Sequence, residues 1–250
     1  MLFEDEIALV TGAGNGIGRA IAIALAREGA RVALADVDRE KGEAARAAAG
    51  DKAIFLPADL GDITAAERLA QETAARLGPP AILVHSASPP RRESDHVFSV
   101  ADDTFEQMLT VNLRSGFRLA RAAGRMMREG GVRGRILFVT SLHAESPRNL
   151  PHYSASKAGM TMLMKEFARD LAPDGIRVNA IAPGAIPGGG FAADPAMAQL
   201  VPMGRFGTPE DVADMALALL CDRFSRYVTG TTVVVDGGLA LHNWIPPRAR

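Results

Sequence analysis

The chain has 250 residues, of which 48% are hydrophobic and 23% are charged, and its formal net charge is −1. Doubly wound α/β folds commonly reach this length as one domain, so we expect residues 1–250 to form a single domain with a substantial core. The balanced charge and the lack of a long basic run exclude nucleic acid or an anionic membrane surface as the main partner on electrostatic grounds.

Cysteine content and the first residues bear on where the protein works. Cys221 is the only cysteine, which excludes an intramolecular disulfide and a metal site built from several cysteines. We therefore expect no metal centre. Residues 1–6 are acidic, unlike the start of a signal peptide, and no apolar stretch approaches the roughly 20 residues needed to span a bilayer. These features predict a soluble cytoplasmic protein.

Short aliphatic runs recur along the chain, and most are followed by a longer alanine-rich helical pattern. We expect strands at 7–11, 31–35, 53–57, 81–85, 134–140, 177–181 and 232–235. We expect helices at 16–28, 39–49, 63–77, 101–129, 152–171 and 209–221. The strand runs are continuously apolar, which is typical of a parallel sheet covered on both faces. The alternation predicts an α/β fold, a single-domain Rossmann-type doubly wound parallel sheet of about seven strands with helices on both faces. Residues 182–203, rich in glycine and proline, are expected to form a loop or lid over the substrate.

A glycine-rich turn joins the first expected strand to the first expected helix. It reads Thr11-Gly12-Ala13-Gly14-Asn15-Gly16-Ile17-Gly18. Glycine allows a positive φ and a close approach of the backbone to a pyrophosphate, and a helix N-terminus supplies free N–H groups. A tight turn alone is weak evidence, but its place between strand and helix predicts a dinucleotide site. We expect Gly12, Asn15, Gly16, Ile17 and Gly18 to contact the cofactor.

The second expected strand leads to Asp36, twenty residues after Gly16. A carboxylate there can accept hydrogen bonds from the adenosine ribose and would repel the 2′-phosphate of NADP. No arginine or lysine occupies position 15 or Val37 to favour that phosphate. The structural alternative for Asp36 is a helix cap, and Asp38 is available for that role. We therefore expect NAD as the cofactor, with Asp36 and Val37 beside it.

Tyr153 and Lys157 are four residues apart at the start of an expected helix, so their side chains share one face. A free tyrosine titrates near ~10, which is too high for an effective base at neutral pH. A nearby ammonium group favours the phenolate and makes proton exchange with an alcohol feasible. Taken alone, Tyr153 and Lys157 have a second interpretation: they are two surface residues that share this spacing by chance.

Further motifs appear in order along the chain: Asp59-Leu60, Val111-Asn112-Leu113, Ser141, Asn179-Ala180-Ile181-Ala182-Pro183-Gly184 and Val235-Asp236-Gly237-Gly238. With the glycine turn and the Tyr153/Lys157 pair, the sequence resembles the short-chain dehydrogenase/reductase family along nearly its whole length. The resemblance implies an NAD-dependent enzyme that acts on CH–OH groups of a small-molecule substrate. It also implies a homotetramer that packs through helices 101–129 and 152–171. Met160, Met162, Met164 and Phe167 give the second helix more apolar surface than one inward face needs.

The resemblance also implies roles for single residues. Tyr153 would be the general acid/base, and Ser141 would hydrogen-bond the substrate oxygen. Lys157 would bind the nicotinamide ribose, and Asn112 would hold a water in the proton relay behind it. Two donors on one oxygen would stabilise the charge that develops as hydride moves. The remaining cofactor contacts would come from Asp59, Leu60, Ser86, Ala87, Pro183, Gly184 and Ile186, besides Tyr153 and Lys157.

Three features depart from the family pattern. Its Asn-Asn-Ala-Gly after the fourth strand reads His85-Ser86-Ala87-Ser88, in which His85 is expected to tie the sheet together through a ring N–H. Ser141 and Tyr153 are twelve residues apart, one fewer than usual. We still choose Ser141 over Thr140 because Gly134-Arg135-Ile136 fixes the strand register. The threonine that often follows Pro-Gly is replaced by Gly188.

The substrate is less defined by the sequence. His143, Glu145 and Asn149 are expected to contact hydroxyl groups of a sugar, a polyol or a sugar-derived acid. His152 and Arg91-Arg92 also fall near the expected pocket, although a solvated loop side chain is the alternative for each of these residues. The layout also resembles bacterial 3-oxoacyl thioester reductases, which usually prefer NADP. A non-catalytic dinucleotide-binding sensor is a further alternative.

Overall fold

The computed structural model describes residues 1–188, 191 and 194–241. Seven strands form one sheet in the order β3-β2-β1-β4-β5-β6-β7, and every neighbouring pair is parallel. They are β1 (Ile7–Thr11), β2 (Arg31–Asp36), β3 (Ala53–Pro57), β4 (Ile82–His85), β5 (Arg135–Val139), β6 (Arg177–Pro183) and β7 (Thr232–Val235). The predicted doubly wound sheet is confirmed.

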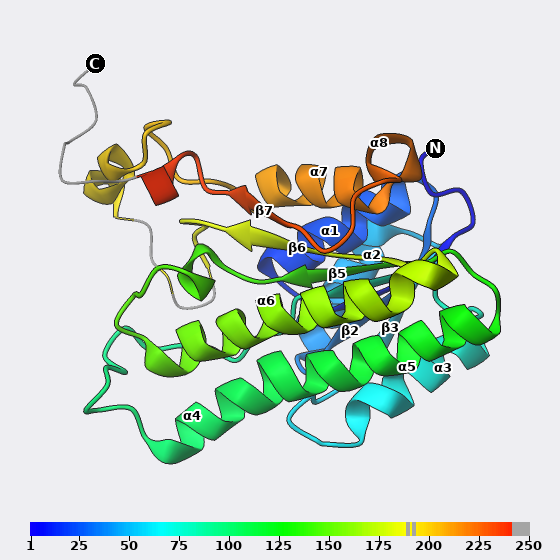
Figure 1. The fold of residues 1–250 in the computed structure, drawn as a ribbon, viewed down its shortest axis with the longest axis horizontal. Helices are drawn as coiled ribbons and strands as arrows, with labels where there is room; N and C mark the ends of the chain where they lie inside the picture. The colour runs from blue at the N-terminus through cyan, green and yellow to red at the C-terminus, as the bar shows by residue number, and fades with distance from the viewer. Residues whose placement is uncertain (189–190, 192–193, 242–250) are drawn as a thin grey trace.

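Helices cover both faces of the sheet, and each face has its own apolar core (Figure 1). One core is covered by α1 (Gly16–Arg27), α2 (Arg39–Ala49) and α7 (Pro209–Leu220). The other core is covered by α3 (Ala65–Arg76), α5 (Ser115–Glu129) and α6 (Pro151–Leu171). The strands are buried on both sides, which explains their continuously apolar sequences. None of the described helices is long and apolar enough to cross a membrane.

The helix expected at 101–129 is wrong as a single α-helix. The chain forms α4 (Asp102–Met108), then a π-helical segment (Leu109–Arg114), and only then α5. A π-helix is hydrogen-bonded from i to i+5, and such segments inside α-helices are frequent at functional sites. Asn112 lies inside this segment.

The expected boundaries need other, smaller corrections. β4 and β5 are shorter than predicted, while β2 and β6 run further, because Asp36 pairs with Pro57 and Pro183 pairs with Val235. The predicted loop at 182–203 therefore begins late, and it contains a 3-10 helix (Pro195–Leu200). Of this loop, residues 189–190 and 192–193, with Gly189 and Gly190, lie outside the described residues. Further short helices are α8 (Asp222–Ser225) and 3-10 turns at Leu142–Ala144, Ala172–Asp174 and Leu239–Leu241.

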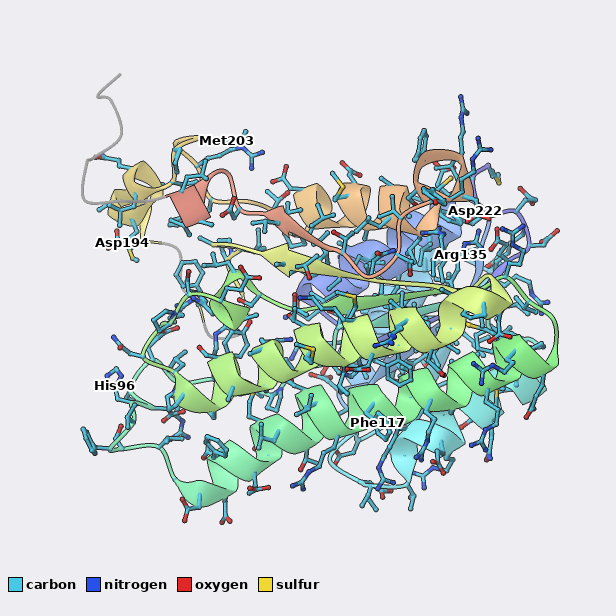
Figure 2. The ribbon with its side chains drawn as sticks, viewed as in Figure 1. His96, Phe117, Arg135, Asp194, Met203 and Asp222 are labelled. Atoms are coloured by element: carbon cyan, nitrogen blue, oxygen red, sulfur yellow. The ribbon has the colours of Figure 1, made fainter. Side chains whose placement is uncertain are left out.

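The strand order reverses between β1 and β4, and ligands of such sheets bind outside the carboxyl ends of the strands at this point. Figure 2 shows His96 and Asp194 together at that end, on loops that follow β4 and β6. Arg135 and Asp222 lie at the opposite end, where Arg135 donates to both carboxylate oxygens of Glu6 at 2.6 and 3.1 Å. One end of the sheet is thus closed by ion pairs, and the other is formed by loops.

Candidate functional site

The glycine-rich turn packs directly against the end of β4. Gly12 has φ +64°, and a Cβ at this position would lie 2.8 Å from the Ala87 Cα, so only glycine fits. Asn15 caps α1, because its side-chain oxygen accepts a hydrogen bond from the Gly16 N–H at 2.8 Å. Gly18 is buried in the first turn of α1. The turn therefore presents glycine backbone and a helix N-terminus, the arrangement that suits a pyrophosphate.

The Asp36 carboxylate lies against this turn. One oxygen accepts from the Gly14 N–H at 2.8 Å, and the other accepts from the Asp38 N–H at 3.0 Å. The helix-cap alternative for Asp36 is wrong, because Asp38 caps α2 by accepting from the Lys41 N–H. The negative charge is thus fixed at the end of β2 beside Gly14.

Other predicted cofactor residues lie along the same edge with different exposure. Val37 is 70% exposed, and the exposed Asp59 accepts from the Gly61 N–H at 2.8 Å. The Leu60 side chain is instead buried in the core. Gly184 and Pro183, where β6 ends, pack beside Asp236, and a Cβ on Gly184 would lie 2.5 Å from the Asp236 Cβ. Ile186 is half-buried against the core on the α1 side.

His85 connects the glycine turn to the π-helical segment. Its Nε2 lies 3.0 Å from the Asn112 carbonyl oxygen, which can only accept, so Nε2 carries the hydrogen. Burial lowers the pKa of His85 to about 4 and keeps the ring neutral. Nδ1 therefore accepts from the Thr11 hydroxyl at 3.0 Å. The Thr11 oxygen in turn accepts from the Ser86 and Ala87 N–H groups.

This network predicts a pH dependence of stability. The pKa of His85 is about 4 in the folded chain and 6.5 in its ordinary environment, so only the unfolded state binds the proton between these values. His85 therefore contributes stability that is present above pH 6.5 and is lost, by up to about 3 kcal/mol, as the pH falls to 4. Denaturant unfolding at several pH values should show a shallower loss for His85→Asn than for the wild type. Parallel curves would contradict the assignment.

The Tyr153/Lys157 pair lies on the first turns of α6. Lys157 is 3% exposed, donates to the Val139 carbonyl at 2.8 Å, and places Nζ 5.7 Å from the centroid of the Tyr153 ring. Burial, followed by the charge of Arg91, lowers the pKa of Lys157 to about 7. Tyr153 is 7% exposed and packs with Met108 and Leu150. The side chains expected to transfer protons therefore share one buried face of α6 at the end of β5.

Ser141 follows directly where β5 ends. Its oxygen accepts from the His143 N–H at 3.1 Å, which leaves the hydroxyl hydrogen available to a substrate. Thr140 is engaged elsewhere, because its hydroxyl donates to the Ile181 carbonyl at 3.0 Å. This geometry supports the choice of Ser141 over Thr140.

Asn112 is buried between α6 and β4. Its side-chain N–H donates to the Ser156 hydroxyl at 2.9 Å, and its carbonyl accepts from His85. Its side-chain oxygen is buried and has no partner among the described residues. Among the described residues, no hydrogen bond joins Asn112 to Lys157. A link between them would need a bridging water.

The predicted substrate residues differ in how they are held. The His143 Nδ1 donates to the Ser146 carbonyl at 3.0 Å. Burial, before any charge, lowers the pKa of His143, so the ring is neutral and its Nε2 is an acceptor. Asn149 has φ +61° and its carbonyl accepts from the exposed His96 at 3.2 Å. Glu145 is exposed.

Three other residues were expected near the pocket: His152 on α6, and Arg91 and Arg92 on the loop after β4. His152 is fully buried next to Tyr153, and Nε2 lies 3.9 Å from an Asp95 carboxylate oxygen. Arg91 places its guanidinium carbon 4.8 Å from the centroid of the Tyr153 ring. Arg92, by contrast, is exposed. The structure therefore brings Arg91 to the Tyr153 ring and leaves Arg92 in solvent.

Thr11 and Ser156 were not predicted as site residues. Thr11 organises the glycine turn through its buried hydroxyl, and Ser156 links Asn112 to the Tyr153 carbonyl. The only signal for Thr11 was its position directly before the turn. Ser156 lies on the same motif as Tyr153, but its partner is 44 residues away and could not be inferred from spacing.

Comparison with known proteins gives consistent matches over nearly the whole chain. A family profile described as "Enoyl-(Acyl carrier protein) reductase" matches residues 12–240. The human (3R)-3-hydroxyacyl-CoA dehydrogenase is 36% identical over 260 residues, covering 94% of this chain and 96% of that protein. The L-rhamnose 1-dehydrogenase (NAD(P)(+)) of Azotobacter vinelandii is 35% identical, covering 96% of this chain and 98% of that protein.

A solved structure agrees with these matches. The crystal structure of 3-ketoacyl-(acyl-carrier-protein) reductase from Brucella melitensis, complexed with NADH, superposes with a TM-score of 0.90 at 30% identity. The match covers 95% of this chain and 99% of that chain. The fold is therefore shared with a reductase whose structure holds NADH.

Proposed function

This chain belongs to the short-chain dehydrogenase/reductase family, and from that premise we propose that it interconverts a secondary alcohol and a ketone, or a sugar hemiacetal and its lactone, with NAD(H). It is an oxidoreductase that acts on CH–OH groups, as its named relatives are. One observation carries the proposal: buried Lys157 lies beside the Tyr153 ring and is bound to Val139, two residues before Ser141.

The chain's residues fit a dinucleotide. A Cβ at Gly12 would meet Ala87, and one at Gly14 would lie 2.9 Å from an Asp36 oxygen, so the turn offers bare backbone at the N-terminus of α1. A dinucleotide bound at this turn would supply the hydride chemistry through its nicotinamide ring. Asp36 would hold the adenosine ribose, while Lys157, Pro183 and Gly184 would lie at the nicotinamide end.

The protein side chains would manage the proton. During oxidation, Tyr153 would take the proton from the alcohol, and during reduction it would return it to the carbonyl oxygen. Ser141 would donate its free hydroxyl hydrogen to the same oxygen and stabilise the developing charge. Lys157, with a pKa of about 7, is able to take or release a proton near neutral pH. Asn112 would hold a water behind it.

We propose NAD rather than NADP because the Asp36 carboxylate is fixed beside the turn by two backbone N–H groups. A 2′-phosphate at the ribose would bring negative charge against it. The relative from Azotobacter vinelandii carries NAD(P)(+) in its name, and the Brucella melitensis structure holds NADH. Both cofactors therefore belong in the test.

For the substrate we propose a sugar, a polyol or a sugar-derived acid. The neutral His143 ring presents Nε2 as an acceptor, which suits a substrate hydroxyl. His143 also follows Ser141 by two residues, and its own N–H donates to the Ser141 oxygen, so the two residues are held close together. Glu145 and Asn149 would contribute secondary contacts. Residues 184–188 and 194–203 would cover the substrate.

His143→Ala should lower kcat/KM for a polyhydroxylated substrate by about tenfold or more, because a substrate hydroxyl would lose its acceptor. The loss should be much smaller for a plain secondary alcohol with no other hydroxyl group. Steady-state kinetics on both substrates measures the difference. Equal losses on the two substrates would remove His143 from substrate recognition.

A second candidate is a 3-oxoacyl thioester reductase. The human relative and the Brucella melitensis structure, both named for acyl thioester chemistry, favour it. A screen of purified protein with sugars, polyols, hydroxy acids and β-ketoacyl thioesters, each with NAD(H) and NADP(H), tests both candidates. The proposal predicts its highest kcat/KM with an NAD(H)-dependent hydroxylated substrate. A clear preference for long acyl thioesters would establish the second candidate.

We also propose a cytoplasmic homotetramer that packs through the α4–α5 region and α6. Met162 on α6 is 56% exposed and Phe117 on α5 is 38% exposed, at the surface that Figure 2 shows for Phe117. Met160 and Met164 are instead buried in the core. Of these three methionines, only Met162 adds exposed apolar surface to α6. Light scattering at micromolar concentration should give a tetramer mass, and a monomer mass would refute the assembly.

A further inference from the structure

A second basic side chain lies at the tyrosine that is proposed to transfer the proton. Arg91, on the loop between β4 and α4, places its guanidinium carbon 4.8 Å from the Tyr153 ring centroid. Lys157 Nζ lies 5.7 Å from the same centroid. A cation at this distance from an aromatic ring is attracted to the ring. Arg91 is thereby held against the Tyr153 ring.

The charge of Arg91 has no counterion in the described part of the chain. Its Nε is buried without a hydrogen-bond partner, and no ion pair or hydrogen bond engages the rest of its guanidinium among those residues. Glu93, two residues further along the same loop, pairs with Arg148 at 2.7 Å. The side chain as a whole is half-buried, and Nε is its only buried nitrogen without a partner among the described residues, so the terminal nitrogens can donate charge-assisted hydrogen bonds to an anion that reaches them.

The positive charge of Arg91 acts on two titratable side chains near Tyr153, those of Lys157 and His143. After burial, it is the next cause that lowers the pKa of Lys157. After burial and the charge of Arg148, it also contributes to the lowered pKa of His143. An anion beside Arg91 would therefore lie near enough to act on the charges of both Lys157 and His143.

We propose that Arg91 binds the carboxylate of a hydroxy acid substrate, on the carbon next to the reacting carbinol or one carbon further away. The inference rests on the function proposed above and narrows its substrate class to acids. The guanidinium is planar and can donate two parallel hydrogen bonds to a carboxylate. An acyl thioester has no charge at this position, because its acyl carbonyl is neutral and its phosphates are remote from the reacting carbon.

The test compares each acid with its uncharged counterpart. Lactate, 3-hydroxybutyrate and gluconate are assayed against their primary amides, with NAD and wild-type protein. At least one acid should exceed its amide in kcat/KM by about 10- to 100-fold, the worth of a charge-assisted hydrogen bond. This comparison needs no variant. Turnover of amides or neutral sugars at rates equal to or above the acids would overturn the proposal while the dehydrogenase assignment stands.

Variants then locate the effect. Arg91→Met should bring the ratio of kcat/KM for the acid to kcat/KM for the amide close to one, and it should leave the Kd for NAD unchanged. Arg91→Lys should restore part of the preference, since it keeps charge without the planar fork. Arg92→Met, at the exposed neighbouring position, should have no effect.

The outcomes distinguish three roles of Arg91: binding the substrate carboxylate, binding a cofactor phosphate, or supporting the structure. Loss of NAD affinity in Arg91→Met, with acid preference retained, would assign the arginine to a cofactor phosphate and overturn the proposal. Equal losses on acid and amide would make Arg91 a structural residue and also overturn it. If wild-type protein reduces neither cofactor with any substrate, the proposed function itself fails.

Discussion

Tyr153→Phe is expected to lower kcat by about a thousandfold, the size of a general acid–base contribution. The substitution removes only the hydroxyl. The ring would keep its packing against Met108 and Leu150 and its contacts with Arg91 and Lys157. No described residue hydrogen-bonds to the Tyr153 hydroxyl, so folding should be unaffected. The Kd for NAD(H), measured by calorimetry, should therefore change by no more than about twofold.

Tyr227 provides the matched control. It is the only other tyrosine in the chain and its side chain is fully exposed. Tyr227→Phe makes the same chemical change without touching the site and should keep wild-type kcat. If Tyr153→Phe retains most of its activity, another group transfers the proton and the assignment of Tyr153 is wrong.

Asp36→Asn is expected to shift the ratio of NAD to NADP affinity toward NADP by about 10- to 100-fold. The amide oxygen keeps an acceptor for the Gly14 N–H, which the carboxylate binds at 2.8 Å, so the turn should hold its shape. What is lost is the negative charge that would repel a 2′-phosphate. Asp36→Ala should also reduce the difference between the NAD and NADP affinities. Because it removes the hydrogen-bond acceptor as well, it should weaken the binding of both cofactors.

Calorimetry with NADH and NADPH measures the four affinities for wild type and Asp36→Asn. Glu40→Gln, which neutralises an exposed carboxylate at the start of α2, controls for a general change in charge. Its affinity ratio should match the wild type. A wild-type preference for NADPH would contradict the role of Asp36 and the choice of NAD.

The number of strands and their places along the chain could be predicted because their signals are local. Each buried strand is a continuous apolar run, and the turn from Thr11 to Gly18 marks where the first one meets its helix. The register of β5 favours Ser141 over Thr140, and the Thr140 hydroxyl is bound to β6, but the role of Ser141 stays a prediction. Strand ends such as Asp36 and Pro183 were missed because the neighbouring strand extends them.

The π-helical segment could not be predicted, because contacts distant in sequence accompany it. The Asn112 carbonyl is bound by His85 from β4, and the Asn112 side chain by Ser156 from α6. The apolar pattern of 101–129 carries no trace of either contact. Arg91 is a similar case. The sequence places it near the pocket, but only the folded loop shows that it lies over Tyr153 while Arg92 points to solvent.

Direct transfer of hydride between a carbinol carbon and the nicotinamide is the central claim, and isotope labelling tests it most directly. The best substrate of the screen, carrying deuterium on the carbinol carbon, is oxidised with NAD, and the isolated NADH is analysed by mass spectrometry. The account predicts one deuterium in the nicotinamide ring and a ketone or lactone as the other product, with almost no product from Tyr153→Phe. Deuterium released to water, or a product formed without reduction of the cofactor, would contradict the account.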